Sequence, residues 1–405
     1  MRPDLALVPP GTALVPADAA ATPSVVDHSP LRVAVVTESF LPTLNGVTVS
    51  VCRVLEHLER RGHEAIVICP GPAPARHAGF AVVGVPAFSY RSFPVGIPTR
   101  LPRTLSAFAP DVVHLASPFV LGAAGATAAR RLGIPSVAVF QTDVPGFARR
   151  HHLSMASSTA WRWLRRLHGQ VDLTLAPSTA ALADLREHAV PRLALWRRGV
   201  DGVRFTPARR QSSAVAALRR ALAPEGQTLV GYVGRLAPEK RVNRLAVLAG
   251  LPDVRLVIVG DGVARGSLER AFAPLDATFL GQLDGDDLAD AYAALDVFVH
   301  TGTEETFGQT VQEAMASGVA VVAPASGGPL DLVTPGVTGL HYPPEDDAAL
   351  RGCIERLARD PGERARMGSA ARAEVEPRTW EALGDELIAH YRQVIARAPA
   401  QLRSA

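Results

Sequence analysis

The sequence is almost devoid of lysine: its 405 residues include 42 lysines and arginines, and Lys240 is the single lysine among them. Cysteine is scarce as well: Cys52, Cys69 and Cys353 share no metal-ligand or redox spacing and lie in apolar or helical patterns, as buried thiols do. No apolar run reaches the roughly 18 residues that a membrane-spanning helix needs. These absences argue against a disulfide-rich secreted protein and a membrane-spanning one, and they predict a reducing compartment.

Charge and length narrow the protein class further. A net charge of +3 is close to balanced for 405 residues, so the concentrated basic face of a nucleic-acid-binding protein is not expected. The length exceeds what one hydrophobic core usually supports, which predicts two domains. Prolines and aspartates interrupt every apolar stretch of residues 1–30, so this segment is expected to be a disordered tail and not a secretory signal.

Short β-branched runs alternate with helical stretches from residue 32 onward, as in βαβ units with parallel sheets. The segment from Arg198 to Pro207 contains two glycines and a proline and is interpreted as the linker between two doubly wound α/β halves. We therefore expect one domain over residues 31–200 and another over 201–376, with a last helix over 379–397 that crosses back to the first. The expected strands cover residues 32–37, 65–69, 81–85, 111–115, 136–140, 173–176, 193–196, 229–233, 255–259, 277–280, 297–300 and 319–322.

The strongest chemical signal follows the expected strand that ends at Val299. A loop leads from His300 into a helix that begins near Gln309, so free backbone amides at the helix start face the edge of the sheet and can hold an anion. Glu305 lies in the loop and Glu313 about one turn inside the helix, where carboxylates accept hydrogen bonds from sugar hydroxyls. The alternative, solvated glutamates favoured by the helix dipole, fits Glu304 better than these two.

The single lysine ends a second loop of this kind. The segment Gly234-Arg-Leu-Ala-Pro-Glu-Lys240 follows an apolar strand and precedes a helical pattern from about Arg241, which places its cations where ligands collect in α/β sheets. An ammonium is a compact point charge, unlike the planar guanidinium that the chain uses elsewhere. The loop therefore predicts a bound phosphate, against the alternative that one lysine has survived by chance.

Together these motifs resemble the retaining glycosyltransferases of family 4. The resemblance rests on the two loops, on Val259-Gly-Asp-Gly262 after the next strand and on Gly199-Val-Asp201 with Phe205-x-Pro207 in the linker, and it covers nearly the whole chain from about Leu31. It implies the GT-B fold, with two Rossmann-like domains that face a central cleft. The first domain would bind the acceptor and the second a nucleotide-sugar.

The resemblance also assigns roles to individual residues. Arg235 and Lys240 match the cations that hold the donor diphosphate and stabilise it as a leaving group, Glu305 the carboxylate near the transferred sugar, and Glu313 the ribose-binding glutamate. The implied donor-binding residues are Gly46, Gly234, Gly260, Asp261, Leu283, Phe307, Gly308, Gln309 and Glu313. Gly46 would allow the first domain's backbone to approach the phosphates, although Asn45 replaces a glycine that the family often has beside it.

One departure concerns the residue near the reacting carbon. Many family members have a histidine after the strand that ends here at Phe140, whereas this chain has Gln141, followed by Thr142 and Asp143. A glutamine can bind a sugar hydroxyl but cannot carry a proton. This favours a front-face mechanism in which the leaving phosphate assists deprotonation of the acceptor. Asp143 is the alternative base, or else a structural cap.

The exact residues of these motifs indicate a donor and an acceptor. They are most similar to GDP-mannose-dependent α-mannosyltransferases of actinobacterial glycolipid synthesis, which predicts a GDP-mannose donor and a lipid or glycolipid acceptor. The alternatives are a UDP-sugar donor, as in glucosyl or sulfoquinovosyl transferases, a sugar-nucleotide epimerase, and a non-catalytic sugar-nucleotide-binding protein. No cofactor is expected, and no metal either, because Asp284-Gly-Asp286 opens a helix and is interpreted as its cap.

A basic, tryptophan-containing stretch predicts where the acceptor would be met. Arginines beside an interfacial tryptophan are typical of a helix on anionic lipid, and the alternative is a helix packed on its own sheet with a solvated basic face. The enzyme is therefore expected in the cytoplasm, as a peripheral protein on the inner face of the plasma membrane. The expected surface residues are Arg149, Arg150, Trp161, Arg162, Arg165 and Arg166.

Overall fold

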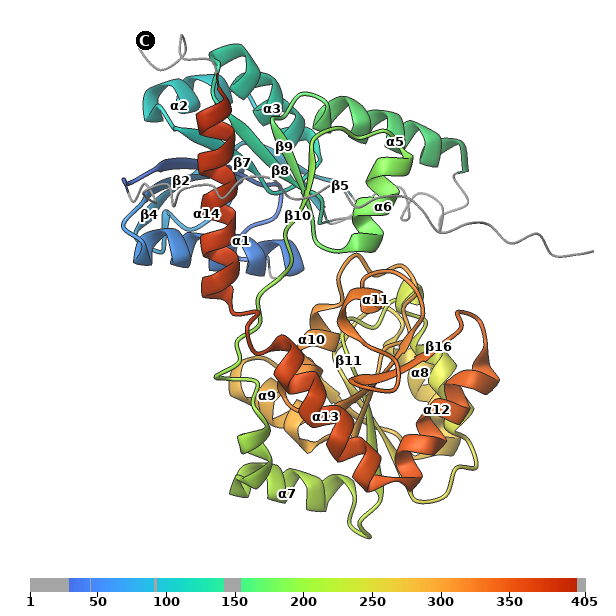
Figure 1. Ribbon diagram of the computed structural model, residues 1–405. Coiled ribbons are helices and arrows are strands. Elements are labelled where there is room, and N and C mark those ends of the chain that lie inside the picture. Colours follow the sequence, from blue (N-terminus) through green and yellow to red (C-terminus); the bar gives the residue numbers. More distant parts are fainter. Residues whose placement is uncertain (1–28, 44, 91–92, 142–153, 399–405) are drawn as a thin grey trace, which may run out of the picture. The chain divides into compact units, whose positions relative to one another are not determined.

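The computed structural model describes residues 29–43, 45–90, 93–141 and 154–398 (Figure 1). The expected tail over residues 1–30 therefore lies, up to residue 28, outside the described residues. From residue 31 the chain forms two parallel sheets flanked by helices, as the α/β prediction required. None of the described helices is both long enough and apolar enough to cross a membrane.

The first sheet has the strand order β10-β9-β8-β7-β1-β2-β4-β3, and the short β3 is its antiparallel edge. Its central strands are buried on both faces, as parallel strands between two helix layers must be. The elements of this half are β1 (Arg32–Val36), α1 (Gly46–Arg60), β2 (Glu64–Pro70), β3 (Arg76–His77), β4 (Phe80–Val85), β5 (Ala87–Tyr90), β6 (Phe93–Gly96), α2 (Leu101–Phe108), β7 (Val112–Leu115), α3 (Val120–Leu132), β8 (Ser136–Val139), α5 (Ser154–His168), β9 (Leu173–Ala176), α6 (Thr179–Glu187) and β10 (Leu193–Leu195).

The second sheet has the order β13-β12-β11-β14-β15-β16, with every neighbouring pair parallel. Its elements are η1 (Pro207–Gln211), α7 (Ser213–Leu222), β11 (Thr228–Val233), η2 (Pro238–Lys240), η3 (Val242–Leu248), β12 (Val254–Val259), α8 (Arg265–Phe272), η4 (Ala273–Leu275), β13 (Thr278–Gly281), α9 (Gly285–Ala294), β14 (Val297–Val299), α10 (Gln309–Ala316), β15 (Ala320–Pro324), α11 (Pro329–Leu332), β16 (Gly339–Tyr342), α12 (Asp347–Arg359), α13 (Pro361–Val375) and α14 (Trp380–Arg397).

Each strand expected from the sequence is present, and the differences lie at the edges. The sequence patterns missed β16, the hairpin β5–β6 and the edge strand β3, which are short or half-exposed and lack a clear apolar run. The helical pattern expected near Arg241 is a 3₁₀ segment, η3, and the left-handed conformation of Arg241, with a φ of 51°, separates it from η2.

The last helix, α14, belongs to the core of the first half. It lies beside α1 (Figure 1). Leu383, Leu387 and Tyr391 belong to the same core cluster as residues of α1 and of the first sheet. The Trp196 indole donates a hydrogen bond to the Leu383 carbonyl at 2.8 Å, and the Tyr391 hydroxyl pairs with His114 Nδ1 at 2.8 Å. The chain therefore returns to the first sheet after completing the second. The returning segment runs parallel to the outgoing one, because the Val200 amide donates to the Arg378 carbonyl at 2.8 Å.

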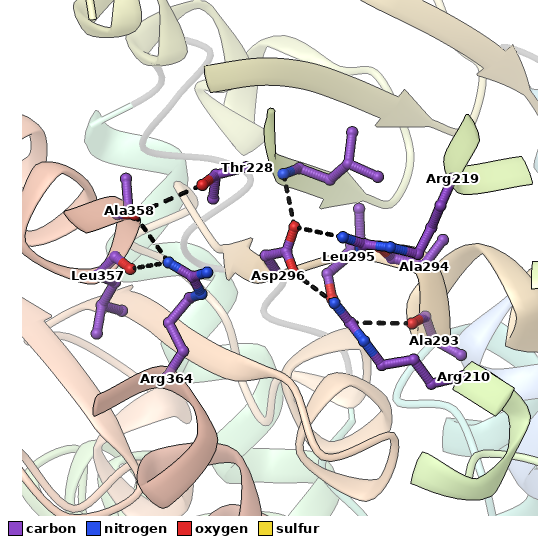
Figure 2. A network of polar contacts seen from close by, with 11 residues as sticks. Arg210, Arg219, Thr228, Ala293, Ala294, Leu295, Asp296, Leu357, Ala358 and Arg364 are labelled. Atoms are coloured by element: carbon purple, nitrogen blue, oxygen red, sulfur yellow. Dashed lines mark hydrogen bonds and ion pairs between the residues drawn. The ribbon is translucent and has the colours of Figure 1, made fainter. Parts of the chain in front are cut away.

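An aspartate with only 8% of its side chain exposed, Asp296, organises the amino-terminal edge of the second sheet (Figure 2). Asp296 accepts hydrogen bonds from the Leu229 amide at 2.9 Å and from Arg219 at 3.2 Å, and it also binds Arg210. Burial alone would raise the pKa of Asp296, but these donors and the two positive charges bring it below its ordinary value. One carboxylate thus ties η1 and α7 to the start of β11, which leaves the carboxyl edge of the sheet for ligands.

Candidate active site

The candidate site lies where the strand order of the second sheet reverses. β11 has β12 on one side and β14 on the other, and ligands of doubly wound sheets bind beside the carboxyl ends of strands at such a point. The loops that follow β11 and β14 carry the lysine and the first glutamate. They are tied to each other, because the Thr301 hydroxyl donates to the Lys240 carbonyl at 2.6 Å.

Lys240 and Glu305 form the centre of this site. Lys240 Nζ lies 2.6 Å from Glu305 Oε2, and His300 Nε2 lies 3.7 Å from the same oxygen. Burial would raise the pKa of Glu305, yet the Lys240 charge brings it below its ordinary value, so the carboxylate is ionised at neutral pH. Burial lowers the pKa of His300 to about 4, which keeps its imidazole neutral.

Arg235, the second expected phosphate ligand, is largely exposed and pairs with Glu239. Gly234 has a φ of 151°, where only glycine fits easily. A Cβ on Gly260 would stand 2.0 Å from the Gly234 carbonyl oxygen, so these two glycines are needed for the close packing of the loops after β11 and β12. Glycine is therefore required here by the packing of the two loops, whether or not a ligand also approaches their backbone.

Asp261 and Leu283, assigned to the nucleoside end of the site, follow the neighbouring strands β12 and β13. The Asp261 carboxylate accepts a bond from the Gly262 amide at 2.6 Å and one from Arg265 at 3.2 Å. Leu283 is partly buried against the core of the sheet. Both residues lie near the same carboxyl edge as Lys240, which is what binding one extended ligand requires.

Glu313 lies on α10, within contact of two neutral donors. Its carboxylate accepts hydrogen bonds from the Tyr292 hydroxyl at 3.0 Å and from Gln309 Nε2 at 3.4 Å. Burial raises the pKa of Glu313 to about 7, although these two donors oppose the shift. Glu305 and Glu313 therefore differ in charge state: the first carries a lysine-paired negative charge, and the second is poised between its two forms.

Phe307, Gly308 and Gln309, whose backbone amides were expected to face a ligand, lie at the start of α10. Gly308 is the N-cap and has a φ of 98°, while the Phe307 ring is buried in the core, so only the backbone of Phe307 is available to a ligand. Sequence reasoning missed the segment that supports this loop. The Gly328 amide donates to the Glu305 carbonyl at 2.7 Å, and a Cβ on Gly328 would stand 2.2 Å from the Phe307 carbonyl oxygen. The adjacent glycines 327 and 328 were the signal that could have revealed it.

In the first half, Gly46 is the first residue of α1, and the Asn45 side chain caps this helix by accepting bonds from the amides of Val47 and Thr48 at 3.0 Å. The replacement of the family's glycine by asparagine therefore gives the helix a cap. A Cβ on Gly46 would meet no atom within 4 Å, which leaves space beside the backbone.

Gln141 is engaged by the protein itself. Its Nε2 donates to the Ala116 carbonyl at 2.7 Å, and its Oε1 accepts a bond from the buried Arg198 guanidinium. These contacts use one donor and one acceptor position of the amide, so the expected bond to a sugar hydroxyl would use the second N–H or the second lone pair of the oxygen. The sequence analysis interpreted the segment that includes Arg198 as a linker and did not predict that the Arg198 side chain is buried. Asp143 lies outside the described residues.

A second carboxyl missed by the sequence analysis is Glu38, which follows β1 at the point where the first sheet reverses its order. It is fully buried, and its Oε1 accepts a hydrogen bond from the Leu121 amide at the start of α3 at 2.8 Å. Burial raises the pKa of Glu38 to about 7 despite the amides at the helix start. Its position at the end of a buried strand was the available signal.

Helix α5 has a buried and a basic face. Trp161 is only 9% exposed and stacks on His188 at 3.6 Å between ring centroids, so it is a core residue and not the surface residue expected from the sequence. Trp163 is 43% exposed and takes the surface position, because it lies on the arginine-bearing face of the helix. Arg162, Arg165 and Arg166 are exposed as expected, while Arg149 and Arg150 lie outside the described residues.

The two aspartates of the Asp-x-Asp sequence lie at the start of α9. Asp284 stands at the N-cap position, although its side chain accepts no capping bond, contrary to expectation. Asp286 pairs with Arg209 at 2.6 Å. Among the residues that the structure describes, no group of three or more histidine, cysteine, aspartate or glutamate side chains is arranged to hold a metal ion.

The chain is similar to known proteins over most of its length. The family described as "Glycosyltransferase Family 4" matches residues 44–204, and "Glycosyl transferases group 1" matches residues 216–374. The chain is 52% identical over 378 residues to a GDP-mannose-dependent alpha-mannosyltransferase of Mycolicibacterium smegmatis, covering 91% of this chain and 98% of the relative. It is 50% identical to the protein of that name from Mycobacterium tuberculosis, covering 92% and 99% of the two chains. The crystal structure of Anabaena HepE in complex with UDP-glucose superposes with a TM-score of 0.75 at 21% identity, over 90% of this chain and 100% of that one.

Proposed function

The chain belongs to glycosyltransferase family 4 and has the GT-B fold, and on this premise we propose that it transfers an α-mannosyl unit from GDP-mannose to a lipid-linked or glycolipid acceptor. The donor is the one named for relatives at about half identity over nearly the whole chain. The observation that carries the proposal is the Lys240–Glu305 contact of 2.6 Å at the switch point of the second sheet. The contact supports the proposal because a cation that can bind phosphate lies beside a carboxylate that can accept a bond from a sugar hydroxyl.

The division of labour that we propose follows the two charge states. Lys240 and Arg235 bind the diphosphate, with amides from the start of α10, and Glu313 accepts bonds from the ribose hydroxyls. Glu305 fixes the transferred sugar by accepting a bond from one of its hydroxyls. Lys240 then exchanges its carboxylate partner for the diphosphate, which is favourable because the diphosphate carries more negative charge than one carboxylate.

We propose retention of configuration by a front-face route. The bond from the anomeric carbon to the diphosphate oxygen breaks, and a bond to the acceptor oxygen forms on the same face. The acceptor's proton passes to an oxygen of the departing diphosphate. The amide of Gln141 supports this route, because it cannot accept the proton. The cations stabilise the charge that develops on the leaving group, a kind of interaction that commonly contributes about 100- to 1000-fold in rate.

A donor screen tests the proposal. Calorimetry on the full chain with GDP-mannose, UDP-glucose, UDP-galactose and UDP-N-acetylglucosamine should give selective binding of GDP-mannose. Selective binding of a UDP-sugar would move the enzyme to a glucosyl or sulfoquinovosyl activity with the same fold. Binding of GDP-mannose without transfer of mannose to any lipid fraction would instead indicate a non-catalytic sugar-nucleotide-binding protein.

We extend the proposal to the place of action, the inner face of a membrane with anionic lipid. The exposed face of α5 carries Arg162, Trp163, Arg165 and Arg166, the combination by which a helix meets such a surface. Sedimentation with phosphatidylglycerol vesicles should be lost when the three arginines are changed to glutamine. Three other exposed arginines of the first half, Arg103, Arg130 and Arg131, provide the matched control. Equal binding by both triple variants would contradict the proposal.

A further inference from the structure

Arg198, in the segment that joins the two sheets, has a backbone held firmly from the second half. The Gln312 side chain donates to the Arg198 carbonyl at 3.0 Å, and Gln309 donates to the Gly199 carbonyl at 3.2 Å. Both glutamines lie on α10, and Gln309 also contacts Glu313. The position of Arg198 is therefore fixed by the helix that opens the candidate donor site.

The guanidinium of Arg198 is buried and faces a neutral partner. It is 9% exposed and donates to Gln141, whose Nε2 is in turn fixed to the Ala116 carbonyl. Within the described part of the chain it forms no ion pair with a carboxylate. Arg244 offers a matched contrast, because it is 8% exposed and pairs with Asp347 at 2.7 Å.

An arginine that is buried without a carboxylate in direct contact is costly to the folded protein. Burial lowers the pKa of Arg198 to about 10, so it still carries its charge at neutral pH. A guanidinium has five N–H donors, of which Gln141 accepts one. A bound anion would recover the cost and use the remaining donors, and a phosphate matches the planar fork of a guanidinium in shape.

The electrostatic neighbourhood indicates which anion. The negative charge of Glu305 acts on Arg198, and Glu305 is also the partner of Lys240. Relying on the proposed donor, we propose that Arg198 binds the sugar-bearing phosphate of the nucleotide diphosphate, as a third cation beside Arg235 and Lys240, and that Gln141 positions its guanidinium. The glutamine that stands where many family members have a histidine thus acts through an arginine.

The test compares diphosphate with monophosphate. Calorimetry with GDP and GMP on the full chain should show that Arg198→Met weakens GDP binding by about 10- to 100-fold, as expected for a lost hydrogen bond between charged groups. GMP binding should change less than threefold, because GMP lacks the phosphate concerned. Arg198→Lys should restore part of the loss. Arg197→Met removes the neighbouring, more exposed arginine and should leave both affinities unchanged.

Each outcome decides between the alternatives. An unchanged ratio of GDP to GMP affinity in folded Arg198→Met would overturn the inference, and a raised KM for the acceptor alone would assign Arg198 to an anionic acceptor group instead. If Arg198→Met does not fold, Gln141→Leu takes its place and should lower the same ratio about threefold to tenfold; an unchanged ratio again overturns the inference. If the wild type prefers UDP, the experiment uses UDP and UMP. A wild type that binds neither diphosphate more tightly than its monophosphate would contradict the proposed function itself.

Discussion

The carboxyl edges of the two sheets solve the same geometric problem with different kinds of contact. At the second sheet, oppositely charged side chains pair with each other: Lys240 with Glu305, and Arg235 with Glu239. At the first sheet, Glu38 is bound by the backbone amide of Leu121. Ion pairs near a surface can exchange one partner for a ligand at little cost, whereas a buried side chain tied to the backbone cannot. The second edge is therefore suited to binding and releasing a charged donor, and the first to holding a fixed framework.

The largest effect should come from removing Lys240, the cation at the carboxyl edge of the second sheet that we propose exchanges Glu305 for the diphosphate. Lys240→Met is expected to lower kcat/KM for mannose transfer by about 100- to 1000-fold, because a charge that stabilises the leaving diphosphate is lost. Lys240→Arg should give an intermediate loss, since the charge remains but its position changes. Steady-state kinetics with GDP-mannose measures both.

The control for this prediction is a cation outside the site. Arg359 is exposed and pairs with Glu355 on α12, so Arg359→Gln should retain the wild-type rate. Near-normal activity of Lys240→Arg would show that a simple positive charge suffices, and the inference from the single lysine would then be wrong.

A smaller effect is expected from Glu305→Gln, which should lower turnover without weakening GDP binding. Turnover should fall about 10- to 100-fold, because a neutral amide holds the transferred sugar less well than a carboxylate. GDP binding should stay equal or become tighter, because Lys240 is released from its partner 2.6 Å away and a negative charge near the phosphate is removed. Calorimetry with GDP and steady-state kinetics separate the two. A parallel loss of GDP affinity would mean that the pair does not exchange partners.

The two edges each contain a carboxyl whose pKa is raised to about 7, Glu38 in the first and Glu313 in the second. A carboxyl with a raised pKa in the folded protein binds more protons than it does in the unfolded chain. Its contribution to stability is present below its ordinary pKa and is lost as pH rises to about 7. Glu38→Gln and Glu313→Gln should therefore raise the melting temperature relative to wild type at pH 8 by about 1–3 °C, and by less at pH 5.5.

The GDP dependence of this pair distinguishes framework from binding site. Saturating GDP should stabilise Glu38→Gln as much as it stabilises the wild type, and Glu313→Gln less, because only Glu313 is proposed to contact the ribose. Scanning calorimetry at both pH values, with and without GDP, gives all the values needed. Equal ligand effects in the two variants would remove the distinction between the edges.

The same contrast explains what could be predicted from the sequence. The charged residues at the carboxyl edge of the second sheet could be predicted, because charged residues in a loop after an apolar strand have few structural uses. Lys240 and Glu305 lie together, as ligands of one donor would require. Glu38 and Arg198 were missed because their partners are backbone groups or side chains far along the chain. Trp161 was wrongly predicted to lie on the surface. Helical spacing shows which residues of α5 share a face, but not which of its two tryptophans is buried by the rest of the protein.

The smallest effect is expected from removing metal ions. Asp286, in the one Asp-x-Asp sequence that resembles a metal motif, is exposed and pairs with Arg209 at 2.6 Å on the first turn of α9. The positive charge that a diphosphate needs is offered at the second edge by Lys240 and Arg235. Mannose transfer should therefore change less than twofold in the presence of EDTA, and Asp286→Asn should cost at most about 1 kcal/mol of stability, as an exposed ion pair does. A rate that falls with EDTA and returns with Mg²⁺ would show that Lys240 and Arg235 do not suffice to neutralise the diphosphate. The ion pairs at the carboxyl edge of the second sheet would then be structural, like the contacts of Glu38 in the first.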